Sequence, residues 1–415
     1  MNKLFFTLIF ALFIIPVFGQ NNTNSPYSVF GIGELDFTGG GRNIGMGSTG
    51  VALRSNLFLN SVNPASLTAI EPKSFGFDMG FDMKLSNLEN TNKSVNVLNG
   101  NISWLQFAFP ITSRLSASIS MNPKSSVGYI IYSAKPFEGT NTTYPVLYTG
   151  TGGLSETAIS LGFKCFKNLS VGATMSFLWG DMNKQTEEFT PVGSVTSILE
   201  NRDIHYNGMA LKTGFQYYKS LTDKVDFTLG GTADFTGNLN STYDLTISEV
   251  TSSATTAILT ETNAHDDMSL PVQYGLGMAL GFYHKTTLTF DYKRSDWTNA
   301  NVNLSSKKLN INNSFHFGAE ISPKYDTGRK GEAMKYRFGA LYQTGYINVY
   351  GIAIDSYAVT LGMSVPIRRD RTSLNFSLEA GRQGTLQNSL IRESYLKLNC
   401  SFNLWEKWFV KRAYD

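Results

Sequence analysis

Charge is scarce in this sequence of 415 residues. Asp, Glu, Lys and Arg make up 16% of it, against roughly 25% in an average soluble domain. Hydrophobic residues make up 42% and aromatic residues 13%, whereas a disordered chain is charged and poor in aromatics. After residue 19, no stretch approaches the roughly 20 consecutive apolar residues of a spanning helix. The composition therefore excludes a disordered chain and a helical membrane protein.

Residues that carry chemistry are scarce as well. The two cysteines, Cys165 and Cys400, are too few for a disulfide framework; we expect free thiols on outward strand positions, with a single bridge as the alternative. The four histidines show no metal-ligand spacing, and no Gly-x-Ser-x-Gly elbow is present. We therefore expect no metal, no cofactor and no enzyme activity, although a scattered Ser/His/Asp set at strand ends stays open. The formal net charge of +3 gives no reason to expect a nucleic-acid partner.

Residues 1–19 have the organisation of a signal peptide. Lys3 precedes an apolar stretch that runs to Phe18, and small residues occupy the −3 and −1 positions of a cleavage site. The following residues, QNNTNSP, are polar and break helices, which disfavours an N-terminal helix of a cytosolic protein as the alternative. The sequence therefore predicts export, with cleavage before Gln20.

From residue 74 onward, the dominant pattern is the alternation of apolar and polar side chains. Near the C-terminus, Leu374, Phe376 and Leu378 alternate with serine, asparagine and glutamate. A period of two places successive side chains on opposite faces of a strand. The fourteen segments with this pattern span residues 74–84, 101–110, 115–123, 155–166, 169–181, 206–218, 225–237, 270–283, 286–296, 312–322, 335–346, 355–366, 371–382 and 392–404.

The connections between these segments alternate in length. Short turns contrast with long polar loops at residues 124–154, 182–205 and 238–269, which is typical of an outer-membrane barrel with its short turns in the periplasm. A sheet in lipid must close on itself, because lipid offers its backbone no hydrogen-bond partner. A secreted sandwich or propeller is the soluble alternative, but its strands would be about 5–6 residues long. The sequence therefore predicts an all-β fold, a transmembrane antiparallel β-barrel of about 14 strands in the outer membrane of a Gram-negative cell.

Residues 20–72 lack this alternation. Residues 31–50 contain eight glycines, which permit unusual dihedrals and close backbone approach, and Asn63-Pro64 predicts a helix start with Asn63 as N-cap. Such a compact segment would fill the lumen as a plug, or hatch; the alternative, a disordered periplasmic tail, would expose apolar residues such as Phe30 and Leu59. The predicted organisation is a signal peptide at 1–19, a hatch at 20–72, a barrel at 73–404 and a C-terminal tail at 405–415.

The run GSTGVAL at residues 47–53, followed by Asn63, Pro64 and Ala65, resembles the N-terminal hatch of the FadL-type outer-membrane transporters of hydrophobic compounds. That family has a small residue–Gly–Ala run followed by Asn-Pro-Ala. The stretch RSNLFLN at residues 54–60 departs from it, because the family has an Asp-containing stretch there. The resemblance implies a fourteen-stranded barrel plugged by an N-terminal hatch and passive transport without a cofactor.

Two sets of residues are candidates for ligand binding. The first, in the hatch, follows from the resemblance and consists of Asn63, Pro64 and Ala65. The second combines an apolar run in a long loop with inward-facing charges. An outer strand end is the alternative interpretation of the loop run, and a network that braces barrel and hatch is the alternative for the charges. The members of the second set are Tyr129, Ile130, Ile131, Tyr132, Glu320, Arg337 and Glu379.

Two functional hypotheses follow. The first is passive uptake of hydrophobic or amphipathic small molecules, fatty-acid-like or aromatic, which leave through a gap in the wall at Asn122-Pro123, where proline cannot donate to the ladder. The alternative is a barrel that binds or shuttles proteins in a secretion system through its long loops, or a structural barrel without transport. The expected partners are the lipid bilayer, a hydrophobic small-molecule ligand, the barrel assembly machinery and a protein at the long extracellular loops.

Overall fold

The computed structural model describes residues 23–37, 39–139, 141–189, 195–283, 285–302, 309–323, 334–367 and 372–407. The predicted signal peptide and residues 408–415 of the predicted tail lie outside these ranges. Among the described residues, no helix is long and apolar enough to span a membrane. The elements are η1 (Pro26–Val29), β1 (Glu34–Leu35), α2 (Gly41–Gly45), η2 (Pro64–Ala69), β2 (Ser74–Glu89), β3 (Ser94–Pro110), β4 (Leu115–Pro136), β5 (Thr143–Lys164), β6 (Leu169–Glu188), β7 (Val195–Thr222), β8 (Val225–Thr251), β9 (Thr255–His265), β10 (Met268–Ser269), β11 (Gln273–Phe282), β12 (Thr286–Asp296), β13 (Ile311–Ile321), β14 (Lys335–Gln343), β15 (Asn348–Val349), β16 (Ile352–Ala353), β17 (Ser356–Pro366), β18 (Ser373–Gln383), η3 (Gln387–Ser389) and β19 (Arg392–Lys407).

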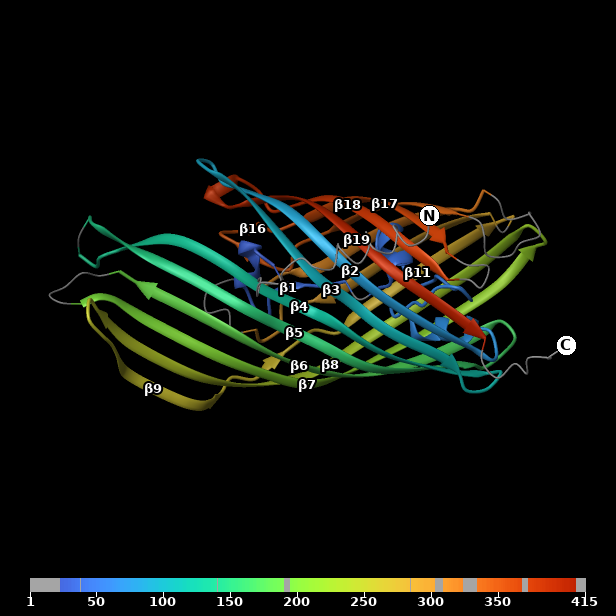
Figure 1. Cartoon of the computed structure of the whole chain (residues 1–415), viewed down its shortest axis with the longest axis horizontal. Helices are drawn as coiled ribbons and strands as arrows, with labels where there is room; N and C mark the ends of the chain where they lie inside the picture. Colours follow the sequence, from blue (N-terminus) through green and yellow to red (C-terminus); the bar gives the residue numbers. More distant parts are fainter. Residues whose placement is uncertain are drawn as a thin grey trace, which may run out of the picture.

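Fourteen antiparallel strands form a closed barrel (Figure 1). Successive strands pair from β2 to β8, β11 then pairs with β8, and the sheet continues through β12, β13, β14, β17 and β18 to β19. The barrel closes where β19 pairs with β2, from Arg392 opposite Glu89 to Lys407 opposite Ser74. Closure gives the first and last strands of the sheet a partner in the hydrocarbon layer, where an unpaired backbone group would have none. The predicted fold class is confirmed.

Side chains alternate across the wall as the sequence pattern requires. In β18, Asn375 and Ser377 face inward and are buried, whereas Phe376 and Leu378 face outward and are exposed. The outward surface is therefore apolar, which suits lipid, while the inward surface is polar. This surface and the closed barrel place the chain in the outer membrane.

Two details at strand ends differ from the prediction. β19 continues to Lys407, past the predicted strand end at Leu404, and stays paired with β2 throughout. Cys165 and Cys400 are both free thiols. Cys400 lies in β19 as expected, but Cys165 lies in the turn that follows β5.

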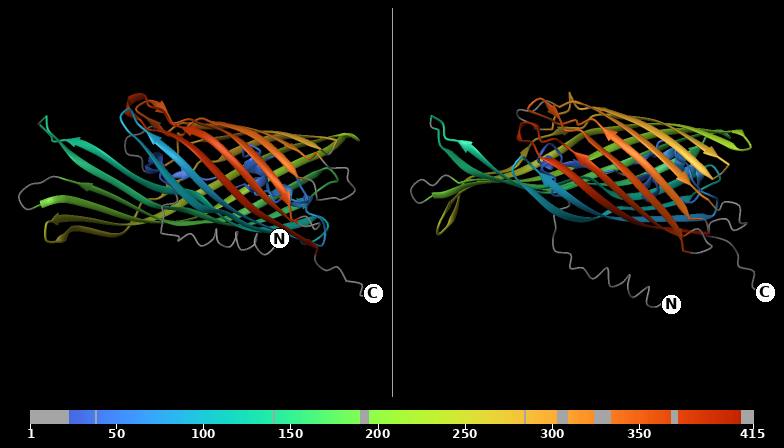
Figure 2. Two further views of the ribbon diagram at one scale, coloured as in Figure 1. Left: turned by 45° about the horizontal axis from the view of Figure 1, so that its top comes forward. Right: turned by 90° about the horizontal axis from the view of Figure 1, so that it is seen from above.

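The prediction of long polar loops is wrong, because most of these residues are strand. β4 to β8 are 20 to 28 residues long, and β9 adds a strand beside β8. Figures 1 and 2 show these strands projecting well beyond one end of the barrel as a twisted sheet, here called the outer extension. In its outer part, polar residues fall on both faces, as with the successive residues Glu200, Asn201, Arg202 and Asp203 of β7, so the alternation that reveals a strand is lost there. The outer extension consists of residues 124–136, 143–154, 182–188, 195–207, 239–251 and 255–265.

The described residues between 23 and 72, here called the N-terminal segment, lie inside the barrel (blue in Figure 2). They pass so close to the wall that glycine is required at several contacts. A Cβ on Gly339 of β14 would lie 2.0 Å from the amide nitrogen of Gly47, and one on Gly172 of β6 would lie 2.5 Å from the carbonyl carbon of Pro64. Gly47 itself has φ +65°, which glycine adopts without steric cost.

The ladder between β3 and β4 ends early. The two strands pair only as far as Leu105 opposite Met121, and the register of β4 against β5 shifts between Pro123 and Ser125. Beyond this point, β1 of the N-terminal segment pairs with β4, with Leu35 opposite Ser125. The predicted interruption of the ladder is therefore present, and the N-terminal segment itself covers part of the open edge of β4.

Candidate functional site

A cluster of buried charges near the periplasmic end ties the N-terminal segment to the wall. Glu320 of β13 accepts hydrogen bonds from Nε and Nη2 of Arg42 in α2, at 3.0 and 2.9 Å, and from Nε of Arg337 in β14, at 2.8 Å. Lys335 Nζ lies 3.9 Å from the same carboxylate. Three cations thus surround one carboxylate, and the ring of Phe58 lies 5.0 to 5.7 Å from their charged ends. We call these five residues the Glu320 cluster.

A second attachment holds the glycine-rich loop. The carboxylate of Asp291 in β12, which is 0% exposed, accepts hydrogen bonds from the backbone amides of Gly50 and Val51 at 2.6 and 2.9 Å. Thr360 of β17 accepts one from the amide of Gly47 at 3.0 Å. Backbone groups of a buried irregular loop have no ladder and need such partners. The wall therefore supplies the hydrogen bonds that the loop cannot make within itself.

The predicted hatch residues lie at the start of η2. Asn63 is the N-cap, as predicted, and its Oδ1 accepts from the amide of Ala65 at 3.1 Å. Its Nδ2 donates to the carbonyl oxygens of Val51 and Phe215 at 2.8 and 3.0 Å. Asn63, Pro64 and Ala65 are all buried, and their contacts hold η2 against β7.

Replacing Asn63 with alanine is expected to lower the free energy of unfolding by about 2 kcal/mol. The change removes the N-cap, typically worth about 1 kcal/mol, and the donor to the carbonyl oxygens of Val51 and Phe215. The measurement is the urea midpoint of unfolding in detergent micelles. Asn56→Ala is the control, because the Asn56 amide donates a hydrogen bond to Glu71 at the exposed surface. Equal midpoints for the two variants would contradict this role of Asn63.

The predicted loop residues Tyr129 to Tyr132 belong to β4, so their assignment to a loop is wrong and the outer-strand alternative is correct. Ile130 and Tyr132 face outward and are 61% and 80% exposed, whereas Tyr129 is 4% exposed. Ile131 is partly buried and packs against the apolar cluster to which Tyr129 belongs. The four residues therefore do not form one surface.

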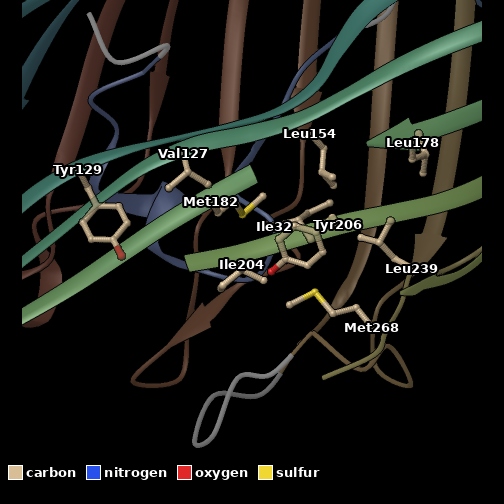
Figure 3. Packing of buried hydrophobic residues seen from close by; sticks show 10 residues of the cluster. All are labelled: Ile32, Val127, Tyr129, Leu154, Leu178, Met182, Ile204, Tyr206, Leu239 and Met268. Atoms are coloured by element: carbon tan, nitrogen blue, oxygen red, sulfur yellow. The ribbon is translucent and has the colours of Figure 1, made fainter. Parts of the chain in front are cut away.

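Tyr129 belongs to a hydrophobic cluster between the N-terminal segment and the wall (Figure 3). Ile32 of the N-terminal segment is 1% exposed at this contact. The other members come from β4 to β8 and from β10, on the side of the outer extension. This outer apolar cluster consists of Ile32, Val127, Tyr129, Leu154, Leu178, Met182, Ile204, Tyr206, Leu239 and Met268.

Charged residues also fix β1 beside the interrupted ladder. Lys84 of β2 binds two carboxylates, that of Glu34 in β1 and that of Glu393 in β19. The distances from its Nζ to their oxygens are 2.8 and 2.9 Å. Asp36 accepts a hydrogen bond from the hydroxyl of Ser126 at 2.7 Å. Burial raises the pKa of Asp36 to about 6, although a nearby lysine opposes the rise. The wall thus holds β1 by side chains as well as by backbone pairing.

Of the predicted site residues, Glu320 and Arg337 are brought together, while Glu379 of β18 instead accepts a hydrogen bond from Tyr395, at 2.8 Å. Sequence reasoning missed Arg42, which binds Glu320 on the other side. One pattern could have revealed it: Arg42 is the single basic residue within the glycine-rich run 31–50. A buried cation requires a buried anion.

Solved structures of other outer-membrane proteins are similar to this chain over most of its length. The P. putida toluene transporter TodX aligns with a TM-score of 0.62 at 17% identity, over 91% of this chain and 100% of that chain. The Ralstonia pickettii toluene transporter TbuX gives 0.58 at 15%, over 88% and 97%, and a Pseudomonas aeruginosa FadL homologue gives 0.58 at 12%, over 91% and 99%. At these identities the likeness concerns the fold, and it confirms the predicted resemblance to FadL-type barrels.

Within the described ranges, no three His, Cys, Asp or Glu side chains are placed to hold a metal ion. No curated protein matches the sequence. A family model described as BamG, in contrast, matches residues 1–415, the full length of the sequence given. With its closed fourteen-stranded barrel and internal N-terminal segment, the chain belongs to the BamG family.

Proposed function

We propose that this chain is an outer-membrane barrel that binds other proteins of the barrel assembly machinery, with residues 20–72 as a fixed plug and the outer extension as the binding surface. The family description BamG supports this partner. The observation that carries the proposal is the contrast between the two parts of the molecule. The lumen is occupied by a segment that buried charges hold in place, while the outer extension presents a long exposed sheet.

The attachments of the plug are strong compared with what a small ligand could supply. Breaking a buried ion pair such as that of Glu320 costs about 3–5 kcal/mol. Leaving the two backbone amides that Asp291 binds without a hydrogen-bond partner adds about 1–3 kcal/mol for each. An aromatic molecule that buries about 200 Å² gains only about 5 kcal/mol. Displacement of the plug by a small hydrophobic ligand would therefore be uphill, which favours a fixed plug.

The outer extension ends in a strand suited to pairing. β9 is exposed along almost its whole length, and Ile258 and Leu259 are 61% and 49% exposed. Edge strands are usually protected by lysine, proline or short length, yet β9 has 11 residues with neither lysine nor proline. An extended segment of a partner could add to such an edge by backbone hydrogen bonds.

The test is purification of the tagged chain after mild detergent extraction, followed by mass spectrometry of proteins and small molecules. In the test variant, a Gly-Asn-Gly turn replaces residues 241–266, which keeps the pairing of Leu239 with Met268. We expect subunits of the barrel assembly machinery with the native chain and a loss of at least about tenfold with the variant, equivalent to about 1.4 kcal/mol. The same turn in place of residues 90–93 is the control. A stoichiometric lipid-like molecule without any protein subunit would overturn the proposal.

Passive uptake of hydrophobic small molecules is the second candidate. The observation that favours it is the position of the outer apolar cluster beside the interrupted β3–β4 ladder, together with neighbours described as toluene transporters. On this route, a molecule would cross the outer apolar cluster and leave between β3 and β4, which requires β1 to separate from β4. Covalent linkage of Leu35→Cys to Ser125→Cys would then abolish uptake, whereas it would leave protein binding intact.

A further inference from the structure

The outward surface carries a basic pocket at the outer rim of the barrel. The pocket is open, with a volume of about 480 Å³, and lies where β17, β18 and β19 meet the turn that contains η3. Its lining includes the phenol of Tyr357, two guanidinium groups and the polar side chains of the turn. These residues are Tyr357, Arg382, Thr385, Gln387 and Arg392.

The pocket lies at the level where the lipid-facing surface changes from apolar to polar. Tyr357 and Arg382 are cross-strand partners on the outward face, and Tyr357 is 51% exposed. Val359 and Leu361 follow Tyr357 on the same face of β17, toward the membrane centre, and they are 61% and 53% exposed. On its other side, Tyr357 pairs with Tyr342 of β14. Tyrosines at this boundary mark the headgroup region.

The two arginines of the pocket have fewer partners than they can bind. Arg392 binds Glu89 through Nη2 at 2.7 Å, but its Nε is buried without a hydrogen-bond partner. Arg382 donates a long hydrogen bond of 3.4 Å to the hydroxyl of Ser394 and forms no ion pair with any residue that the structure describes. The pocket lining therefore contains two guanidinium groups and no carboxylate, and of the two only Arg392 has an ion-pair partner among the described residues.

We propose that this pocket binds the phosphate of a phosphorylated lipid headgroup in the outer leaflet. A guanidinium matches phosphate oxygens with paired donors, and Thr385 and Gln387 supply neutral donors from the turn. The acyl chains of such a lipid would lie along the apolar surface that includes Val359 and Leu361. The same chemistry would accept free phosphate, so the test must separate the two sources.

The test compares lipids that differ only in phosphate. The protein is held in dodecyl maltoside micelles, which contain no phosphate, with either lipid A or lipid A without its phosphates, and retained lipid is counted by native mass spectrometry. We expect the native chain to retain at least about tenfold more of the phosphorylated form, and the variant R382Q/R392Q to lose this preference. R294Q is the matched control, because Arg294 is another exposed outward arginine near the outer end of a strand, β12. Heat-dependent mobility in SDS gels shows whether each variant is folded.

Three results would overturn the proposal. One is equal retention of the two lipids by the native chain. Another is a loss of preference in R294Q as large as in the double variant, since any exposed arginine would then suffice. The third is displacement of lipid A by an equal concentration of inorganic phosphate, which would assign the pocket to a free anion.

Discussion

Replacement of Glu320 by alanine should lower the free energy of unfolding by about 3–5 kcal/mol, the range for loss of one partner from a buried ion pair. The carboxylate is the shared partner of Arg42, Lys335 and Arg337. The side chains of Arg42 and Arg337 are only 9% and 0% exposed, so neither guanidinium group has much contact with solvent. The variant leaves three cations close together around the ring of Phe58.

Guanidinium unfolding in detergent micelles measures this loss. Glu379→Ala is the matched control, because Glu379 also faces the lumen but binds Tyr395 through one hydrogen bond; a loss of about 1 kcal/mol is expected there. Trypsin cleavage after Arg42 should also become faster in Glu320→Ala, since the N-terminal segment loses an attachment. Equal stability losses in the two variants would show that the Glu320 cluster has no special part in holding the plug.

Gly339→Ala should cost about 3 kcal/mol and displace the N-terminal segment from β14. The added methyl group would lie 2.0 Å from the amide nitrogen of Gly47 and 2.5 Å from the carbonyl carbon of Met46. Both neighbours are backbone atoms, so no side-chain rotation relieves the overlap. Overpacking in a close-packed interior typically costs about 1–3 kcal/mol, and a rigid contact of this kind lies at the upper end.

The control for this prediction is Gly100→Ala in β3, where the nearest atoms would lie 3.7 Å from the new Cβ. The melting temperature and the rate of tryptic cleavage after Arg54 are measured for both variants. A melting temperature of Gly339→Ala within error of the control would mean that the loop at Gly47 is free to shift, and the fixed plug would be excluded.

Most of the barrel could be predicted from the sequence because lipid and lumen impose opposite requirements on successive residues. In β18, for example, Phe376 must face lipid and Ser377 the lumen, so the pattern itself records the strand. The outer extension escapes this logic, since polar residues such as Arg202 and Asp203 succeed one another and so fall on both of its faces. Asp203, for instance, binds Asn183 across the sheet, and such polar residues resemble a solvated loop.

The candidate site was less accessible to prediction. Asn63 could be assigned as an N-cap because the cap and its helix are adjacent in sequence. The partner of Arg42 could not be assigned, because Glu320 lies 278 positions away and several inward carboxylates compete for that role. Contacts of this kind depend on how the closed barrel brings distant strands around the N-terminal segment.

This arrangement has a consequence for biogenesis. The N-terminal segment is synthesised first, yet its partners include Asp291 in β12, Thr360 in β17 and Ser377 in β18, which binds the carbonyl oxygen of Gly41. The wall cannot close until β19 reaches β2. Contacts between such distant residues form slowly, because the chain entropy of long loops must be lost first. The contacts that fix the N-terminal segment are therefore complete only after β12, β17 and β18, which lie late in the chain, have joined the wall.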